Sequence, residues 1–265
     1  ILRKRPNGLL VVENMREVGK RKLPMVQAVL EPDMVYPFVE WKRIGRFWAQ
    51  PSQHILMVQD PQKRTGYDER WLKLELPNTY AFLKRFEKTL RRRSGFKKYF
   101  RAEKDPFYSM YNIGTYSFAP FRVIWRSMGT SIRSTVLEAI EDRFVGAKPP
   151  IHKNTVMFVS FQTKQPAHFL CAVLNTSIVT FVARAYSVEG GKSFGSANLL
   201  QFVAVPQFDA TNPLHVHLAE LSMLAHKLAA SGEPEDLEAL VEVKDQVDQA
   251  AAQLWGITEP EMREI

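Results

Sequence analysis

The sequence predicts an α+β fold, in which a mixed sheet of short strands packs with helices and a helical segment closes the chain. Two observations predict it. Short apolar runs with strand character are mixed with helical periodicity, without a regular βαβ alternation, and after residue 206 the pattern is helical only. Of the 265 residues, 45% are hydrophobic, which is enough to bury one sizeable core or two small ones.

Runs rich in apolar and β-branched residues between turn residues predict the strands. They lie at residues 8–14, 25–30, 54–59, 121–125 and 155–161.

Helical periodicity predicts four helices. Residues 79–93 form an amphipathic pattern that Asn78 would cap, and residues 167–185 are apolar nearly all round, which is typical of a buried helix. Residues 213–230 and 235–255 follow, separated by Gly232 and Pro234. We therefore expect one domain over residues 1–209 and a helical segment over residues 210–265.

The start of the chain, the cysteine content and the hydropathy predict the cellular compartment of the protein. The chain opens at Ile1 without a methionine or a signal-like run, so we expect an excised or processed fragment. Its one cysteine, Cys171, excludes a disulfide framework and favours a reducing compartment, the cytoplasm. No run approaches the roughly 18 to 20 apolar residues of a membrane span, so we expect no membrane partner.

The charge is unevenly distributed along the chain. Residues 1–101 hold 23 Lys and Arg against 10 Asp and Glu, a balance of +13, whereas residues 211–265 hold 3 against 11, a balance of −8. A basic surface gains affinity for phosphates through counterion release. The asymmetry favours a nucleic-acid partner, although charge alone is equally compatible with a solvated surface.

Strings that imitate catalytic motifs are incomplete. The run Gly190-Gly191-Lys192-Ser193 lacks the first glycine of a phosphate-binding loop, because Tyr186 stands there. Residues 105–108 and 148–151 each lack part of the Asp/Asn-Pro-Pro-aromatic motif of amino-methyltransferases. One cysteine and scattered histidines argue against zinc. We therefore predict neither a catalytic residue nor a metal ligand.

Three segments combine basic, aromatic and small polar residues in the way that a DNA surface requires: residues 41–48, 125–133 and 189–198. Each by itself also fits an exposed turn, a solvated charged face or a connector. With the basic run at 91–93, they supply the residues that we expect to contact DNA: Trp41, Lys42, Arg43, Arg46, Arg91, Arg92, Arg93, Arg126, Ser127, Thr130, Ser131, Arg133, Gly190, Gly191, Lys192, Ser193, Ser196 and Asn198.

An ordered set of segments resembles a known family. The run VYPFVEWKRI at residues 35–44 resembles the segment YPLLRGRDI that opens the target-recognition domain of adenine-specific DNA methyltransferases, and PNTYAFL at 77–83 resembles the family's PNTYKYL. Further similar segments follow in order at residues 107–111, 119–125, 154–158, 170–177, 198–208 and 253–259. The chain thus resembles the C-terminal specificity domain of type IIG, Eco57I-like and TaqI-like enzymes of restriction-modification systems. It departs from them at Glu40, where the family usually has arginine or glycine.

The resemblance implies a division of labour. A catalytic domain elsewhere in the parent protein would bind S-adenosylmethionine and flip the target adenine, and the parent could also be an endonuclease. This chain, without a cofactor of its own, would bind double-stranded DNA next to that domain. We expect phosphate contacts from the basic residues at 42–46 and 91–98, and base contacts from the loops at 126–133 and 190–198.

Other functions remain open from the residues alone. Asp33, Glu40 and Lys42 resemble the acidic and lysine set of a metal-dependent nuclease, although Tyr36-Pro37 would interrupt the hairpin that such a site needs. The acidic C-terminal helices could instead form a protein-interaction module. RNA is a third possible ligand, but the sequence shows no RNA-recognition strand motif with its stacking aromatics.

Overall fold

In a computed structural model, residues 1–16, 22–187, 194–196 and 198–265 are described. The chain divides into two compact units, each assembled from separate stretches of sequence. Unit 1 comprises residues 1–37, 53–118 and 140–151, and unit 2 comprises residues 38–52, 119–139 and 152–265. Strands and helices are mixed in both units, so the predicted α+β class is confirmed. The division into a recognition domain at residues 1–209 and a helical segment at residues 210–265 is a functional division, and it stays a prediction.

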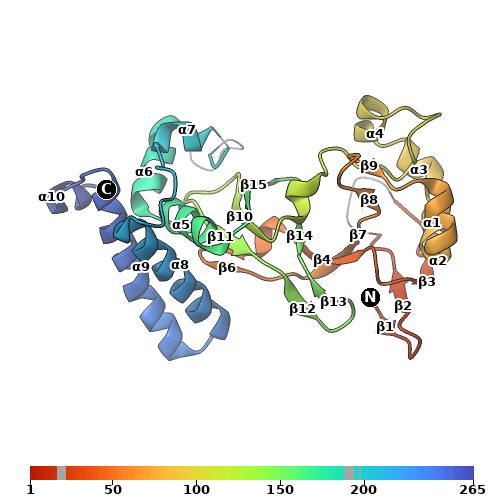
Figure 1. Ribbon diagram of the computed structural model, residues 1–265, viewed down its shortest axis with the longest axis horizontal. Helices are drawn as coiled ribbons and strands as arrows, with labels where there is room; N and C mark the ends of the chain where they lie inside the picture. The colour runs from red at the N-terminus through yellow and green to blue at the C-terminus, as the bar shows by residue number, and fades with distance from the viewer. Residues whose placement is uncertain (17–21, 188–193, 197) are drawn as a thin grey trace. The chain divides into compact units, whose positions relative to one another are not determined.

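Unit 1 is built from short strands and short helices (Figure 1). Its strands are β1 (Arg3–Lys4), β2 (Leu10–Glu13), β3 (Gln27–Leu30), β7 (Gln53–Leu56), β8 (Gln59–Asp60), β9 (Thr65–Gly66), β12 (Ile140–Asp142) and β13 (Gly146–Lys148). Its helices are α1 (Glu69–Glu75), α2 (Pro77–Lys84), α3 (Glu87–Arg91), α4 (Ser94–Tyr99) and the 3₁₀ helix η2 (Thr115–Phe118). The antiparallel sheet β1–β2–β3 packs through Leu10 and Leu30 onto one small core, and α1 and α2 cover a second.

Unit 2 pairs a three-stranded antiparallel sheet with a group of helices. Its strands are β5 (Ile44–Gly45), β6 (Trp48–Ala49), β10 (Phe121–Arg126), β11 (Ser134–Leu137) and β15 (Val156–Phe161), with β10 in the centre of the order β11–β10–β15. Its helices are η1 (Trp41–Arg43), α5 (Lys164–Leu174), α6 (Ser177–Tyr186), α7 (Leu199–Val203), α8 (Pro213–Ser231), α9 (Pro234–Leu254) and α10 (Glu259–Met262). Strands β4 (Val35–Val39) and β14 (Ile151–His152) each contain residues of both units.

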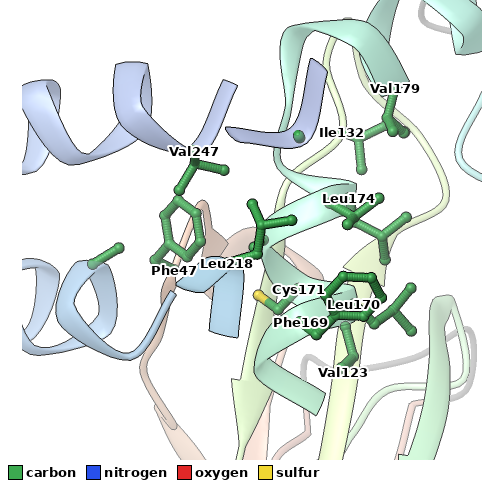
Figure 2. Packing of buried hydrophobic residues seen from close by; sticks show 14 of the residues in the cluster. Phe47, Val123, Ile132, Phe169, Leu170, Cys171, Leu174, Val179, Leu218 and Val247 are labelled. Carbon is green, nitrogen blue, oxygen red and sulfur yellow. The ribbon is translucent and has the colours of Figure 1, made fainter. Parts of the chain in front are cut away.

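The largest core lies in unit 2, around α5 (Figure 2). Every residue of α5 from Ala167 to Leu174 is buried, as its nearly uniform apolar sequence predicts. Side chains from β10, α8 and α9 meet it there, among them Val123, Leu218 and Val247. Phe47 joins them from the turn between β5 and β6, where it adopts a left-handed backbone (φ 60°) and is 2% exposed.

The long predicted helix at residues 167–185 is two helices, α5 and α6, bent by 62° at Asn175 and Thr176. The Asn175 side chain accepts a hydrogen bond from the Ser134 N–H and donates one to the Ser134 carbonyl, so it pairs with β11 as a neighbouring strand would. The Thr176 hydroxyl then caps α6 by accepting from the Val179 N–H. The side chains of Asn175 and Thr176 thus form hydrogen bonds with backbone groups of β11 and α6, and these bonds stabilise the bend between the two helices.

The predicted helix at residues 79–93 is also divided, into α2 and α3. The first starts two residues earlier than predicted, at Pro77, and Asn78 is not its cap. The carboxylate of Glu31 caps it instead, by accepting hydrogen bonds from the N–H groups of Asn78 and Thr79. Capping rules consider only residues next to the helix in the sequence, so they cannot identify a cap that is 47 positions away.

Among the described residues no single helix is long and apolar enough to span a membrane, and α5 with α6 meets that test only as a bent pair.

Candidate functional site

The candidate site lies in unit 2, at the end of the central strand β10. Trp125 and Arg126 end the strand, and the run to Arg133 that follows is one of the three segments predicted to bind DNA. Trp125 is 1% exposed, which ties this segment to the core, whereas Met128, Thr130 and Arg133 are exposed. A rigid strand thus carries a surface loop, an arrangement common in binding sites.

The segment at residues 41–48 lies beside this strand end. The Arg126 guanidinium donates through Nη2 to the carbonyl oxygen of Lys42 at 3.1 Å and lies over the Trp41 ring, 5.5 Å from its centre. Two predicted segments, more than 80 positions apart in the sequence, therefore share a hydrogen bond and a cation–π contact.

The segment at residues 189–198 reaches the same place through Gly195. The Trp125 indole N–H donates to the Gly195 carbonyl oxygen at 2.8 Å, and the Gly195 N–H donates to the Ser127 carbonyl oxygen at 3.0 Å. A Cβ atom at residue 195 would collide with the Arg126 carbonyl oxygen, so a glycine is required for this approach. All three predicted segments are thus brought together around Arg126.

A hollow of about 320 Å³ opens between the segments at residues 41–48 and 125–133 and the stretch before β15. Trp41, Arg126, Ser127, Met128, Lys153 and Thr155 line it. The Ser127 hydroxyl donates to the Thr155 carbonyl oxygen at 3.0 Å, which joins the strand end to the stretch before β15. Two cations therefore line the hollow and none of its lining residues is acidic.

One hydrogen-bond donor of the Arg126 side chain is buried without a partner in the described part of the chain. Its Nε atom is buried and has no hydrogen-bond partner among the described residues. Burial, and then the nearby positive charge of Arg133, lower the pKa of Arg126 from its ordinary value. A buried donor without a partner costs free energy.

Lys153, Thr155 and Met128 line the hollow but are not among the predicted contacts. Lys153 and Thr155 flank Asn154, which opens one of the segments that carry the family resemblance. This position next to a family-like segment was the only sequence feature that could have identified Lys153 as a site residue. A lone lysine in a turn has no pattern that distinguishes a binding residue from a solvated charge.

The remaining predicted residues fall into three groups. Lys42 and Arg43 are exposed on η1, and Ser131, Ser196 and Asn198 are partly or fully exposed in the two loops. Arg92 is exposed on unit 1. Gly190, Gly191, Lys192 and Ser193 lie outside the described residues.

Arg46 is held inside unit 2. Burial lowers its pKa, and it interacts electrostatically with Asp248 and Lys244 of α9. Asp248 in turn accepts a hydrogen bond from the Ser177 N–H at 2.8 Å, at the start of α6. These contacts connect Arg46 to the helical packing.

Arg91 and Arg93 are held inside unit 1. Arg93 donates to the carbonyl oxygens of Leu90, Phe107 and Ser109, and burial lowers its pKa. Arg91 forms an ion pair with Glu87 at 2.9 Å and donates to the Ala102 carbonyl oxygen. Both guanidinium groups connect the α3–α4 region to the chain that follows it.

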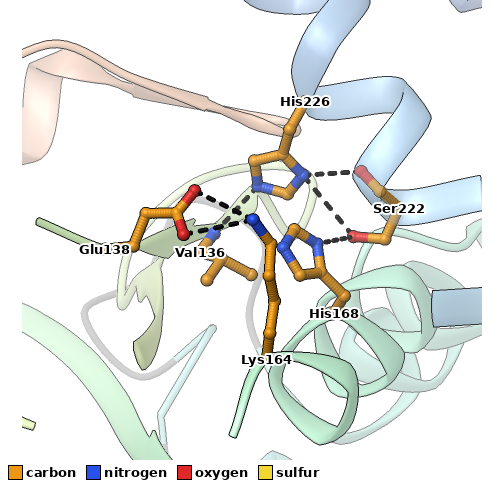
Figure 3. Close-up of polar contacts among 6 residues, drawn as sticks. All are labelled: Val136, Glu138, Lys164, His168, Ser222 and His226. Atoms are coloured by element: carbon orange, nitrogen blue, oxygen red, sulfur yellow. Dashed lines mark hydrogen bonds and ion pairs between the residues drawn. The ribbon is translucent and has the colours of Figure 1, made fainter. Parts of the chain in front are cut away.

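A separate polar cluster joins α5, α8 and β11 inside unit 2 (Figure 3). The Val136 N–H donates to His226 Nε2 at 3.0 Å, so the ring proton is on Nδ1, which donates to the Ser222 carbonyl oxygen at 2.7 Å. His168 Nδ1 lies 3.0 Å from the Ser222 hydroxyl. Burial lowers the pKa of His168 to about 3 and that of His226 to about 4, so both rings are neutral at pH 7. These contacts are internal and hold the three elements together.

Among the described residues, no group of three or more His, Cys, Asp or Glu side chains is placed to hold a metal ion. Of the residues in the alternative nuclease set, Asp33 belongs to unit 1, and Glu40 and Lys42 belong to unit 2.

The comparison with curated proteins gives a sequence relationship to a methyltransferase. No protein-family profile matches the sequence. The chain is 24% identical over 149 residues to the type II methyltransferase M.NspV of Nostoc sp., a match that covers 56% of this chain and 29% of the relative. The chain thus spans less than a third of the length of this relative. It is related in sequence to part of a type II DNA methyltransferase.

Proposed function

We propose that this chain recognises a specific sequence in double-stranded DNA, as the target-recognition domain of an adenine-specific DNA methyltransferase. In this proposal a catalytic domain outside these residues binds S-adenosylmethionine and methylates the adenine. The parent enzyme serves restriction-modification or phage defence in the cytoplasm, where the free thiol of Cys171 is stable.

One observation carries the proposal. The three segments predicted to bind DNA, far apart in the sequence, meet around Arg126 at the end of β10. Cations, short hydroxyls and a tryptophan ring are thereby assembled on a rigid strand end, and these are the groups that contact phosphates and base edges.

Two further findings support it. The balance of +13 over residues 1–101 supplies a long-range attraction for a polyanion. The relationship to a type II DNA methyltransferase links the chain to enzymes that must select a site on DNA.

Selection from a pool of random duplexes, with sequencing of the bound fraction at two salt concentrations, tests the proposal. We expect an enriched motif and an affinity that falls steeply as salt rises. Binding without an enriched motif would contradict sequence recognition by this chain alone. Absence of binding at low salt would overturn the proposal and favour the protein-interaction alternative, whereas magnesium-dependent cleavage of the pool would favour the nuclease.

A further inference from the structure

We propose that the hollow lined by Trp41, Arg126, Ser127, Met128, Lys153 and Thr155 binds one backbone phosphate of the DNA together with its deoxyribose. The inference rests on the proposed function and names the part of the DNA that this site holds. It assigns phosphate binding to Arg126, which the sequence led us to expect as a base reader, and adds Lys153 as a second phosphate contact.

The charge of the lining selects an anion. Arg126 and Lys153 both line the hollow, and no carboxylate does. The ion pairs of the described residues do not include Lys153. Hydrogen bonds from a guanidinium or an ammonium group to a phosphate oxygen are charge-assisted, and they are stronger than neutral ones.

The geometry of Arg126 favours phosphate over a base edge. Its Nη2 donates to the Lys42 carbonyl oxygen, and its guanidinium lies over Trp41. The group is therefore held in place, and part of the fork that reads guanine is already used. A fixed guanidinium beside a lysine is suited to positioning the backbone, which is the task of phosphate contacts.

The size and the apolar part of the lining fit the sugar. A volume of about 320 Å³ exceeds the space that a phosphate group alone requires, and Trp41 and Met128 supply apolar surface beside the cations. The deoxyribose next to a bound phosphate would cover that surface.

A second hollow in unit 2 provides a contrast. It has a volume of about 540 Å³ and is lined by Pro213, Leu214, His217, Gln246, Gln249, Ala250 and Gln253. It is larger, but no lysine or arginine lines it. The two cations in its lining, Arg126 and Lys153, therefore distinguish the hollow at Arg126.

The test compares Lys153→Met with Lys227→Met, since Lys227 is an exposed lysine of the same unit on α8, outside the hollow. Binding of the full chain to a duplex of mixed sequence is measured by fluorescence anisotropy between about 50 and 200 mM salt. We expect Lys153→Met to weaken binding roughly tenfold at low salt. The slope of log K against log salt should fall in magnitude by about 0.9, the loss of one phosphate contact. The enriched motif should stay the same, and Lys227→Met should match the unaltered protein.

A ligand titration of the unaltered protein tests the hollow directly, so its result does not depend on whether the Lys153→Met variant folds. Deoxyribose 5-phosphate and deoxyribose are each added to the unaltered protein, and the indole signal of Trp41, assigned with Trp41→Phe, is followed by NMR. We expect the phosphorylated sugar to shift this signal and the neutral sugar to have no effect.

The outcomes separate the two proposals. If the unaltered chain binds DNA with an enriched motif but Lys153→Met behaves as Lys227→Met does, the hollow is not a phosphate site and the proposed function stands. A changed motif with an unchanged salt slope would make Lys153 a base contact and overturn the inference. If the unaltered chain binds no duplex, the proposed function fails and this inference fails with it.

Discussion

The indole N–H of Trp125 donates a hydrogen bond to the carbonyl oxygen of Gly195, and the two atoms lie 2.8 Å apart. Because Trp125 is 1% exposed, this bond ties a surface loop to the core of unit 2. It also brings Gly195 against the backbone of Arg126, where space for a side chain is lacking. The position of the candidate site therefore depends on one residue without a side chain.

Gly195→Ala should destabilise unit 2 by about 1–3 kcal/mol, the usual cost of forcing an extra methyl group into a packed place. The new Cβ would collide with the Arg126 carbonyl oxygen, a backbone atom that cannot rotate away. Urea unfolding measures the effect. Gly95→Ala is the control, since nothing lies within 4 Å of a Cβ there, and it should leave stability unchanged or raise it. Equal stabilities for the two variants would contradict the close approach.

Glu31→Gln should destabilise unit 1 by about 2–3 kcal/mol at pH 7. Each Glu31 oxygen accepts two hydrogen bonds from Asn78 or Thr79, and a glutamine NH₂ would face two of these donors. Burial raises the pKa of Glu31, but the hydrogen bonds from Thr79 and Asn78 outweigh it and lower the pKa below 4.5. The stabilisation is therefore complete above pH 4.5 and lost as the pH falls through the lowered value.

Denaturant unfolding at pH 7 and in acid checks this, with the exposed Glu75→Gln as control. The difference between Glu31→Gln and the unaltered protein should shrink in acid. A difference that did not change with pH would mean that the charge of Glu31 is unimportant.

Arg93→Met should lower stability by about 1–3 kcal/mol, because three carbonyl oxygens lose their donor. Lys97→Met, at an exposed position of α4, should leave stability within about 0.5 kcal/mol. Thermal or urea unfolding of both variants measures this. If Arg93→Met were as stable as Lys97→Met and weakened DNA binding instead, Arg93 would be the phosphate contact that the sequence led us to expect.

The stability of unit 2 should fall as the pH drops from about 6.5 toward 4. Burial lowers the pKa of His168 to about 3 and that of His226 to about 4, so the unfolded chain binds protons in this range and the folded chain does not. The free energy of unfolding measured across this range should show the loss, and His168→Gln should reduce it. His217→Gln, at an exposed position of α8, should leave the pH dependence as it is. A flat profile for the unaltered protein would contradict neutral buried rings.

The sequence by itself determined the α+β class, the positions of several of the longer elements and the three segments of the candidate site. Residues 121–125, 213–230 and 235–255 were predicted within one residue of β10, α8 and α9, because their periodicity and their proline and glycine breaks are local signals. The same reasoning located Trp41, Arg126 and Ser127 by residue type.

Only the tertiary structure decided which of the basic residues line the hollow. Arg46, Arg91 and Arg93 have the same chemistry as Arg126, but they lie outside its lining and interact with carbonyl oxygens or carboxylates of their own units. Likewise the bend at Asn175, the cap from Glu31 and the place of Lys153 in the hollow depend on partners about 40 or more residues away, or on several segments at once. Hydrogen bonds and burial act through space, so a pattern within one segment cannot specify them.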